Sequence, residues 1–165
     1  MILSAKQIIK LKLVNNLLDQ SGQVQPCGVD FTLKKVSVWK DSGIIDFDNS
    51  KRKLAQTEIL KFKEDGINLP QGGYLIEFNE TVTMPLNIMG TLQTRSSLFR
   101  VGASLQAGVI EPSYNGAVGA MLQVWNNFGI TLLKNAKLGQ WIFSEIMDPD
   151  EKGYEGVYQN AEKII

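Results

Sequence analysis

The sequence predicts an all-β fold, either a sandwich, a jelly roll or a barrel, that begins with a short helix and ends in a mobile tail. Two observations lead to this prediction. After Gly22, short stretches follow one another in which apolar and polar residues alternate, and this alternation is the pattern of a strand with one buried face. Turn signals separate these stretches, and many short strands with close turns are typical of sandwiches, jelly rolls and barrels.

The elements can be assigned in chain order. Ser4 is a suitable N-cap for a short first helix. A strand is predicted over residues 28–35, where Val29, Phe31 and Leu33 alternate with polar neighbours. Turn-forming residues at 41–43, 65–66, 71–73 and 126–129 divide the remainder. The other predicted strands cover residues 73–78, 81–84, 88–93, 104–110, 117–125, 130–133 and 138–146.

A chain of 165 residues fits one domain with a sizeable core. We therefore predict one β domain over residues 1–147, including the first helix. Residues 148–165 are polar and rich in Gly, Tyr and Glu, so we expect a mobile tail. The segment from Asp46 to Asp65 is dense in Lys and acids and fits no clear strand pattern. A loop over the site and an additional helix both remain open for it.

Composition excludes several kinds of function. Seventeen basic and seventeen acidic side chains balance, so no overall charge attracts nucleic acid or an anionic membrane. The apolar runs are far shorter than a membrane span and the N-terminus lacks a signal-peptide pattern, which predicts a cytoplasmic protein. The chain has no His and a single Cys. Serine–histidine catalysis, His-containing zinc sites and intrachain disulfides are thereby excluded, and hydrolysis must depend on carboxylates, hydroxyls, amides, Lys, Arg or a hard metal ion.

A polar segment at residues 94–102 carries the densest set of candidate ligand-binding groups. Arg95, Ser96, Ser97 and Arg100 combine hydroxyls with guanidinium groups, which are donors suited to phosphate oxygens. If Ser96 begins a helical turn, its backbone N–H groups add partial positive charge. A polar turn with solvated arginines is the alternative explanation for this short motif.

Two carboxylates accompany this segment. Glu111 follows an apolar stretch, is fixed by Pro112 and precedes Tyr114, which predicts a position at the edge of a cleft. Asp30 lies upstream in the segment Gln25–Asp30. An Asn-Ala-Lys-Leu-Gly-Gln segment at 135–140 leads into a further predicted strand.

In their order along the chain, these segments resemble the trimeric dUTPase and dCTP deaminase superfamily. The resemblance rests on Arg-Ser-Ser-Leu-x-Arg-x-Gly at 95–102, Ala-Gly-x-Ile-acid-x-x-Tyr-x-Gly at 107–116 and Leu-Gly-Gln at 138–140. The opening Met-Ile-Leu-Ser, residues 25–30 and residues 154–159 are similar to the deaminase branch. The resemblance extends from Met1 to about Gln159. It implies a distorted jelly roll of the dUTPase type, or β-clip, in a homotrimer with active sites at subunit interfaces.

The resemblance also implies roles for individual residues. Asp30 would lie near a Mg²⁺ ion and contact it through water, since magnesium keeps several waters in most sites. Glu111 would activate the attacking water, and Tyr114 would pack on the deoxyribose. A tail that includes Tyr154 would close over the nucleotide. The triphosphate would be bound by Arg95, Ser96, Ser97 and Gln140, and the pyrimidine edge would be recognised by Gln106, Ala107 and Gly108.

Two departures from the superfamily pattern bear on the reaction. Gln123 stands where the resemblance places the proton-shuttling glutamate of dCTP deaminases, and an amide cannot accept and return a proton near neutral pH. Gln123 could equally be an outward-facing strand residue without a role. Glu111 replaces the usual Asp and is longer by one methylene, so either the site is rebuilt around it or activity is weak.

The sequence thus predicts a dUTP diphosphatase that forms dUMP and pyrophosphate with Mg²⁺. One alternative is a dCTP deaminase, either monofunctional or combined with dUTP hydrolysis. Another is a non-catalytic nucleotide-binding homologue. The last alternative is a jelly roll without enzymatic activity that serves only in assembly, like a viral coat protein or a lectin. This alternative leaves the clustered Arg95, Ser96, Ser97 and Gln140 unexplained.

Overall fold

Strands form most of the regular structure in the computed structural model, which describes residues 1–164. The longer strands are β3 (Gly28–Trp39), β6 (Gly72–Thr83), β7 (Ile88–Thr94), β8 (Ala103–Gln106), β9 (Asn115–Val124) and β11 (Lys137–Glu145). The shorter ones are β1 (Val14–Asn15), β2 (Val24–Gln25), β4 (Thr57–Ile59), β5 (Ile67–Leu69) and β10 (Ile130–Leu132). The helices are short: α1 (Ala5–Lys10), α2 (Gln20–Gln23) and α3 (Ser96–Arg100). The predicted all-β fold is confirmed.

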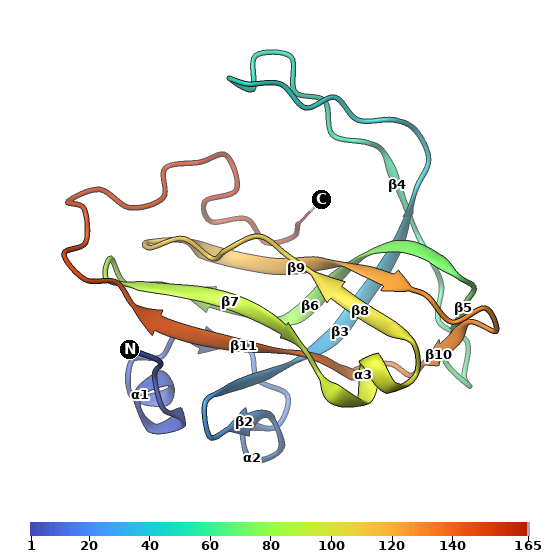
Figure 1. Cartoon of the computed structure of the whole chain (residues 1–165), viewed down its shortest axis with the longest axis horizontal. Coiled ribbons are helices and arrows are strands. Elements are labelled where there is room, and N and C mark those ends of the chain that lie inside the picture. The colour runs from blue at the N-terminus through green and yellow to red at the C-terminus, as the bar shows by residue number, and fades with distance from the viewer. Residues whose placement is uncertain (165) are drawn as a thin grey trace.

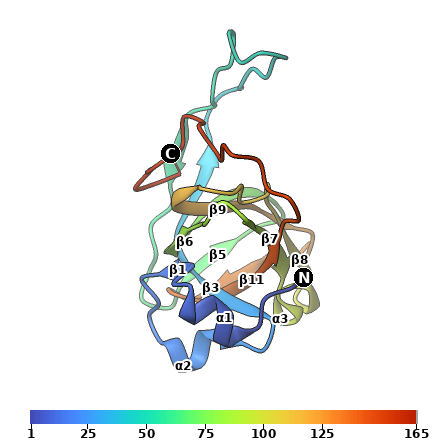
Figure 2. The same ribbon diagram turned by 90° about the vertical axis from the view of Figure 1, so that its left-hand side faces the viewer.

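The main sheet curls into a nearly closed barrel. Its strands are antiparallel in the order β7-β11-β3-β6-β9-β8, and β10 pairs separately with β5. The open side between β7 and β8 is bridged by two backbone hydrogen bonds between Gly90 and Ile110, at 3.0 and 2.9 Å. Figure 2 shows the strands surrounding a central space with α1 and α2 below them.

Aromatic side chains fill the interior of the barrel. Phe31, Phe78, Trp141 and Phe143 are almost completely buried, and the rings of Phe31 and Phe78 meet edge to face at 5.7 Å. Burying such a side chain stabilises the fold by about 1.5–3 kcal/mol. The alternation that predicted β3 places its apolar residues in this core.

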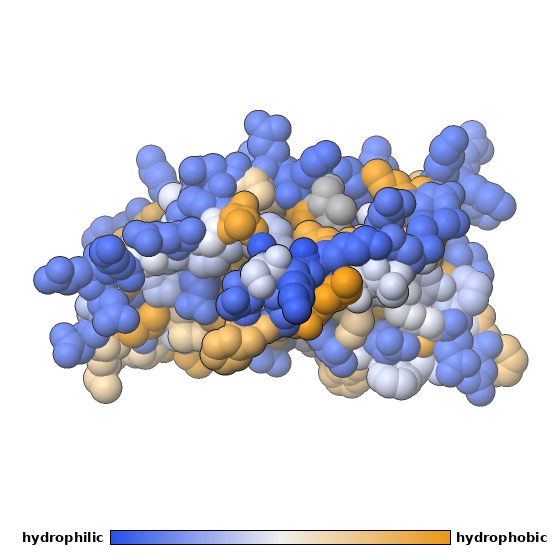
Figure 3. All heavy atoms as spheres, turned by 90° about the horizontal axis from the view of Figure 1, so that it is seen from above, coloured by the Kyte–Doolittle hydropathy of each residue, from blue (hydrophilic) through white to orange (hydrophobic). Residues whose placement is uncertain are grey.

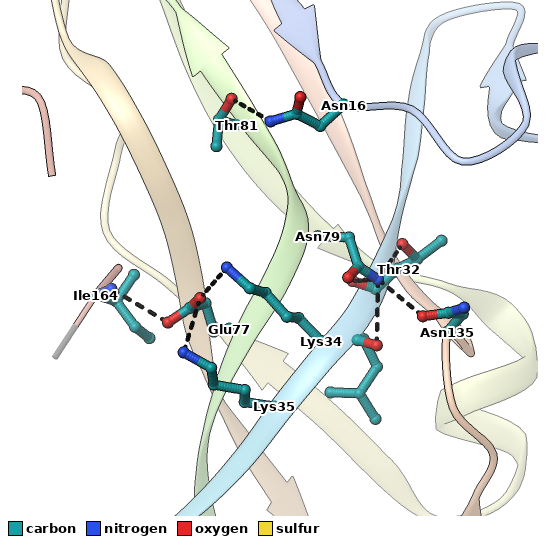
Figure 4. Close-up of polar contacts among 10 residues, drawn as sticks. Asn16, Thr32, Lys34, Lys35, Glu77, Asn79, Thr81, Asn135 and Ile164 are labelled. Atoms are coloured by element: carbon teal, nitrogen blue, oxygen red, sulfur yellow. Dashed lines mark hydrogen bonds and ion pairs between the residues drawn. The ribbon is translucent and has the colours of Figure 1, made fainter. Parts of the chain in front are cut away.

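Two predicted strands, 73–78 and 81–84, form one continuous strand, β6. Its pairing register with β9 shifts between Glu77 and Thr81. The buried carboxylate of Glu80 lies in this irregular stretch and accepts hydrogen bonds from Thr32 N at 2.8 Å and Thr32 Oγ1 at 2.6 Å. Asn79 also bonds to Thr32 and to Asn135, as Figure 4 shows. Polar residues in the sheet interior therefore interrupt the apolar alternation without ending the strand.

The predicted strand 104–110 is shorter than expected. β8 ends at Gln106, and only Ile110 returns to the sheet, where it pairs with Gly90. The intervening residues turn outward, and Val109 is half exposed. The first helix begins after Ser4 as predicted, and Gln7 Oε1 accepts a hydrogen bond from Ser4 N at 2.9 Å.

Residues 40–56, here called the arm, extend away from the barrel between β3 and β4 (Figure 1). No helix forms between residues 46 and 65, so the helix considered for this segment is not formed. Asp41 closes the base of the arm by accepting a hydrogen bond from Gln56 N at 2.6 Å. The apolar tip residues Ile45 and Phe47 are exposed.

The tail, residues 148–164, folds back across the sheet above β9 (Figure 1). The backbone pairs Asn160 N with Asn115 O and Ala117 N with Ala161 O, both at 2.8 Å. Near the end of the described chain, Ile164 N donates to Glu77, whose carboxylate also meets Lys34 at 2.6 Å (Figure 4). None of the helices within residues 1–164 is long and apolar enough to cross a membrane.

Candidate active site

Three charged side chains meet where β3, β11 and the start of α3 come together. Asp30 Oδ2 lies 3.1 Å from Arg95 Nε and 3.8 Å from Lys137 Nζ. Arg95 also donates to Lys137 O at 3.1 Å, and Lys137 Nζ donates to Gly22 O at 2.8 Å. Backbone carbonyl groups thus hold both cations beside the carboxylate in this structure.

Asp30 is buried while its two cationic neighbours are partly exposed. Burial raises the pKa of Asp30 above its usual 3.8, and the charges of Arg95 and Lys137 act in the opposite direction. Oδ2 is buried and lacks a hydrogen-bond partner within residues 1–164. Oδ2 therefore pairs with the two cations by charge, without a well-aligned hydrogen bond.

Gln140 lies beside Asp30, because the two residues are direct partners in the β11–β3 ladder and partners share one face of a sheet. Gly28 leaves room for it: a Cβ at this position would lie 3.0 Å from the Gln140 side chain. We call Asp30, Arg95, Lys137 and Gln140 the Asp30 cluster.

Ser96 and Ser97 adjoin this cluster at the start of α3, immediately after Arg95, and both are exposed. Arg95 is the N-cap residue, and its backbone N–H donates to Leu138 O at 3.1 Å. The structure thus brings together the predicted residues Asp30, Arg95, Ser96, Ser97 and Gln140. Lys137 was given no role from the sequence, although its place between Asn135 and Gln140 was available as a signal.

A cavity of about 330 Å³ lies beside the connection between β8 and β9. We call it the hairpin cavity. Glu111 and Tyr114 line it together with Gly108, and Trp141 closes its inner end. Trp141 Nε1 is buried without a hydrogen-bond partner in the described chain, so it offers the cavity a donor.

Tyr114 is fixed in the wall of this cavity. Its hydroxyl donates to Ala117 O at 2.6 Å, and its ring meets that of Tyr154 edge to face at 5.4 Å. Burial and the neighbouring Tyr154 raise the pKa of Tyr114, so it remains a neutral donor near pH 7. The exposed carboxylate of Glu111 is at the mouth.

The tail covers the hairpin cavity. Tyr154, Tyr158 and Ile164 all line it. Gly119 permits this close approach, because a Cβ there would collide with Ile164 and with Ile76 O. Gln106 and Ala107 line an adjoining hollow of about 310 Å³ that shares Gly108 with the cavity.

In one chain the hairpin cavity and the Asp30 cluster are separate. Ile110, next to Glu111, pairs with Gly90, whereas Arg95 follows the opposite end of β7. Five residues of strand correspond to roughly 16 Å. No member of the Asp30 cluster lines the cavity. Within one chain, a ligand that contacts both groups would have to span this separation.

Gln123 belongs to neither group. It pairs with Gly73 and with Ser104 in the sheet, and it lies on the opposite face of β9 from the buried Leu122 and Val124.

The acidic residues present fit a Mg²⁺ ion only if phosphate groups supply most of its ligands. Within residues 1–164 no three Asp, Glu or Cys side chains gather closely enough to hold a metal ion. The single buried oxygen of Asp30 that lacks a partner could accept a hydrogen bond from metal-bound water. Such limited use of carboxylates is usual for Mg²⁺ sites that include substrate phosphates.

A curled antiparallel sheet that carries a cation-rich cluster and a separate aromatic cavity defines a class of small-ligand-binding β protein. Comparison with known families narrows this class: the chain belongs to the dCTP deaminase-like family, whose model matches residues 2–146.

Similar relatives include archaeal proteins. The chain is 41% identical over 165 aligned positions to a probable deoxyuridine 5'-triphosphate nucleotidohydrolase of Methanosarcina mazei, with 96% of each chain covered. It is 37% identical to the deoxyuridine 5'-triphosphate nucleotidohydrolase of Methanocaldococcus jannaschii, over 92% of this chain and 98% of that one.

Among solved structures, a 2'-deoxycytidine 5'-triphosphate deaminase from Agrobacterium tumefaciens has a similar fold. The TM-score is 0.65 at 19% identity over 86% of this chain. The chain spans only 46% of the length of that deaminase. This similarity supports the jelly-roll fold and bears on nothing further.

Proposed function

We propose that this protein is a dUTP diphosphatase that hydrolyses dUTP to dUMP and pyrophosphate. The observation that carries the proposal is the similarity, over almost the whole chain, to archaeal proteins named as deoxyuridine triphosphate nucleotidohydrolases. The Asp30 cluster with its adjoining serines and the hairpin cavity are here called the two half-sites. They supply the groups that such a reaction requires: cations and hydroxyls for phosphates, and a cavity with a carboxylate at its mouth for a nucleoside.

In this proposal the hairpin cavity binds the nucleoside. Tyr114 packs against the deoxyribose, and its fixed ring leaves no room for a 2'-hydroxyl. The pyrimidine is recognised along the segment Gln106, Ala107 and Gly108, largely through backbone groups. Glu111 accepts a proton from the water whose oxygen attacks the α-phosphorus, and the bond to the β-phosphate oxygen breaks as pyrophosphate leaves.

The Asp30 cluster binds the triphosphate. Arg95, Ser96, Ser97 and Gln140 hold the phosphate oxygens in line for displacement. Asp30 would hold Mg²⁺ through water, and when bound the ion neutralises negative charge that builds on the phosphates. The Oδ2 atom of Asp30, which accepts no hydrogen bond within the described residues, supports this role.

The separation of the half-sites supports an assembly with active sites between subunits, and we propose a homotrimer. The tail, with Tyr154, would act as a lid that excludes water during the reaction. The neutral charge balance is consistent with nucleotides as partners, without a role for nucleic acid or membranes, and we propose a cytoplasmic enzyme.

The second candidate is dCTP deamination, alone or together with dUTP hydrolysis, which the family assignment favours. Gln123 opposes it, because its amide cannot shuttle a proton. A non-catalytic nucleotide-binding homologue is the third candidate, since Glu111 replaces the usual aspartate.

Incubation with dUTP and, separately, with dCTP in the presence of Mg²⁺ tests the proposal, with products resolved by chromatography. We expect dUMP and pyrophosphate from dUTP and no change in dCTP. Conversion of dCTP would establish the deaminase. Turnover of neither nucleotide would rule out both reactions, and tight dUTP binding would then identify a regulatory homologue.

A further inference from the structure

The arm has no part in the proposed function, yet its base is held in a defined conformation. Asp41 accepts hydrogen bonds from Gln56 N at 2.6 Å and from Lys53 Nζ at 3.0 Å. The backbones of Ile44 and Lys53 exchange two further hydrogen bonds, at 2.8 and 3.0 Å. Leu54 lies between these two anchor points, so its side chain has a fixed direction although the arm is largely solvent-exposed.

Leu54 points to the proposed nucleoside site. It lines the hollow of about 310 Å³ whose other wall contains Gln106, Ala107 and Gly108, the segment proposed to recognise the pyrimidine. Leu75 and Met121 form its floor. The surface seen from above is mainly hydrophilic with a few separate apolar patches (Figure 3).

A pyrimidine presents polar atoms at its edge and an apolar surface on each face. A segment that reads the edge through backbone groups leaves a face to be covered by an apolar side chain. Within the described residues, Leu54 is the arm side chain that lines the hollow, and it remains 48% exposed. It thus retains apolar surface that a bound base would bury.

We propose that Leu54 is a substrate-contacting residue that packs on the pyrimidine and so contributes to nucleotide affinity. The inference rests on the proposed function and extends it to the arm. Arg52 joins the arm to the tail, because its guanidinium lies 5.8 Å from the centre of the Tyr158 ring. Arm and tail therefore cover the nucleoside site together.

The test is Leu54→Ala, with Phe47→Ala as the matched control. Phe47 belongs to the same arm but is fully exposed and lines no described cavity wall of the site. We expect Leu54→Ala to raise KM for dUTP about tenfold, which is the effect of losing a small apolar contact in a pocket, with kcat almost unchanged. Phe47→Ala should retain the original KM. Inhibition by inorganic triphosphate, which has no base, should be equal in all three proteins.

A second comparison separates direct contact from an effect through the tail. If Leu54 touches the base, Leu54→Ala raises KM by a similar factor with Tyr158 intact and in Tyr158→Ala. Loss of the Leu54→Ala effect in the Tyr158→Ala background would overturn the proposal, as would an equal loss of triphosphate inhibition.

Binding of a non-hydrolysable dUTP analogue distinguishes failure of this inference from failure of the proposed function. Tight binding by the original protein and about tenfold weaker binding by Leu54→Ala supports the contact even if no hydrolysis occurs. Hydrolysis of dUTP with identical constants in both proteins contradicts the contact and leaves the proposed function standing.

Discussion

The carboxylate of Asp30 lies 3.1 Å from Nε of Arg95, and this pair links a buried acid of the barrel to a side chain that we propose for phosphate binding. Asp30 is buried on β3, whereas Arg95 is partly exposed at the start of α3. The same guanidinium that we propose for phosphate binding therefore also supplies a counter-charge to a buried acid.

Arg95→Ala should consequently weaken both folding and binding. Removing one partner leaves the other charge buried and poorly compensated. Because Lys137 remains nearby and Arg95 is partly solvated, we expect the free energy of unfolding to fall by only about 1–2 kcal/mol. KM for dUTP should rise at least about tenfold. Urea denaturation and steady-state kinetics measure the two effects.

Arg100→Ala is the control for this experiment. Arg100 lies in the same helix, but it is exposed and its guanidinium lies over the Phe99 ring at 5.3 Å. An equal loss of affinity in Arg100→Ala would contradict the specific role assigned to Arg95.

Asp30→Asn should have opposite effects on stability and activity. Burial raises the pKa of Asp30 above 3.8 despite its cationic neighbours. The folded state then binds this proton more tightly than the unfolded chain, so the Asp30 contribution to the free energy of unfolding falls as pH rises above about 4. We expect Asp30→Asn to be more stable than the original protein at neutral pH, with the difference shrinking below about pH 4. Activity should fall about 10–100-fold.

Thermal denaturation of both proteins from acid to neutral pH measures the first effect. If the difference in stability between the original protein and Asp30→Asn does not depend on pH, Asp30 does not titrate as described.

Glu111→Gln should separate catalysis from folding. Loss of a general base lowers kcat by about 10²–10⁴-fold, whereas Glu111 is exposed and contributes little to packing. We expect an unchanged melting temperature and a nearly unchanged affinity for dUTP. Glu155→Gln, an exposed acid in the tail, is the control. Substantial turnover by Glu111→Gln would assign the base to another residue.

Glu80→Gln should destabilise the protein even though the Glu and Gln side chains have the same shape. The Glu80 carboxylate accepts hydrogen bonds from Gln23 Nε2, Thr32 N and Thr32 Oγ1, at 2.6, 2.8 and 2.6 Å. An amide must place its own N–H₂ against at least one of these donors. We expect the free energy of unfolding to fall by about 2 kcal/mol in urea denaturation. Glu64→Gln, at an exposed position, should have no measurable effect.

The alternation of apolar and polar residues predicted the strands well where one face is buried and the other is exposed to solvent. It divided β6 in two because Asn79 and Glu80 are polar residues with partners inside the sheet. Such partners come from distant parts of the chain, so no local pattern reveals them.

The arm shows a similar limit. Its conformation depends on the Asp41 side chain bonding to the backbone of Gln56, and such a contact leaves no apolar periodicity to detect. The predicted phosphate-binding residues do lie together in space. Lys137 and Gln23, which surround Asp30, could not be chosen from spacing alone.

The roughly 16 Å of strand between the two half-sites has a consequence for genetics. In the proposed assembly, each site takes Glu111 from one subunit and Arg95 from another. Two impaired variants, Glu111→Gln and Arg95→Ala, would each weaken every site when alone. Mixed within one oligomer, they would place an intact Glu111 opposite an intact Arg95 at some interfaces, so that two defective alleles together restore function.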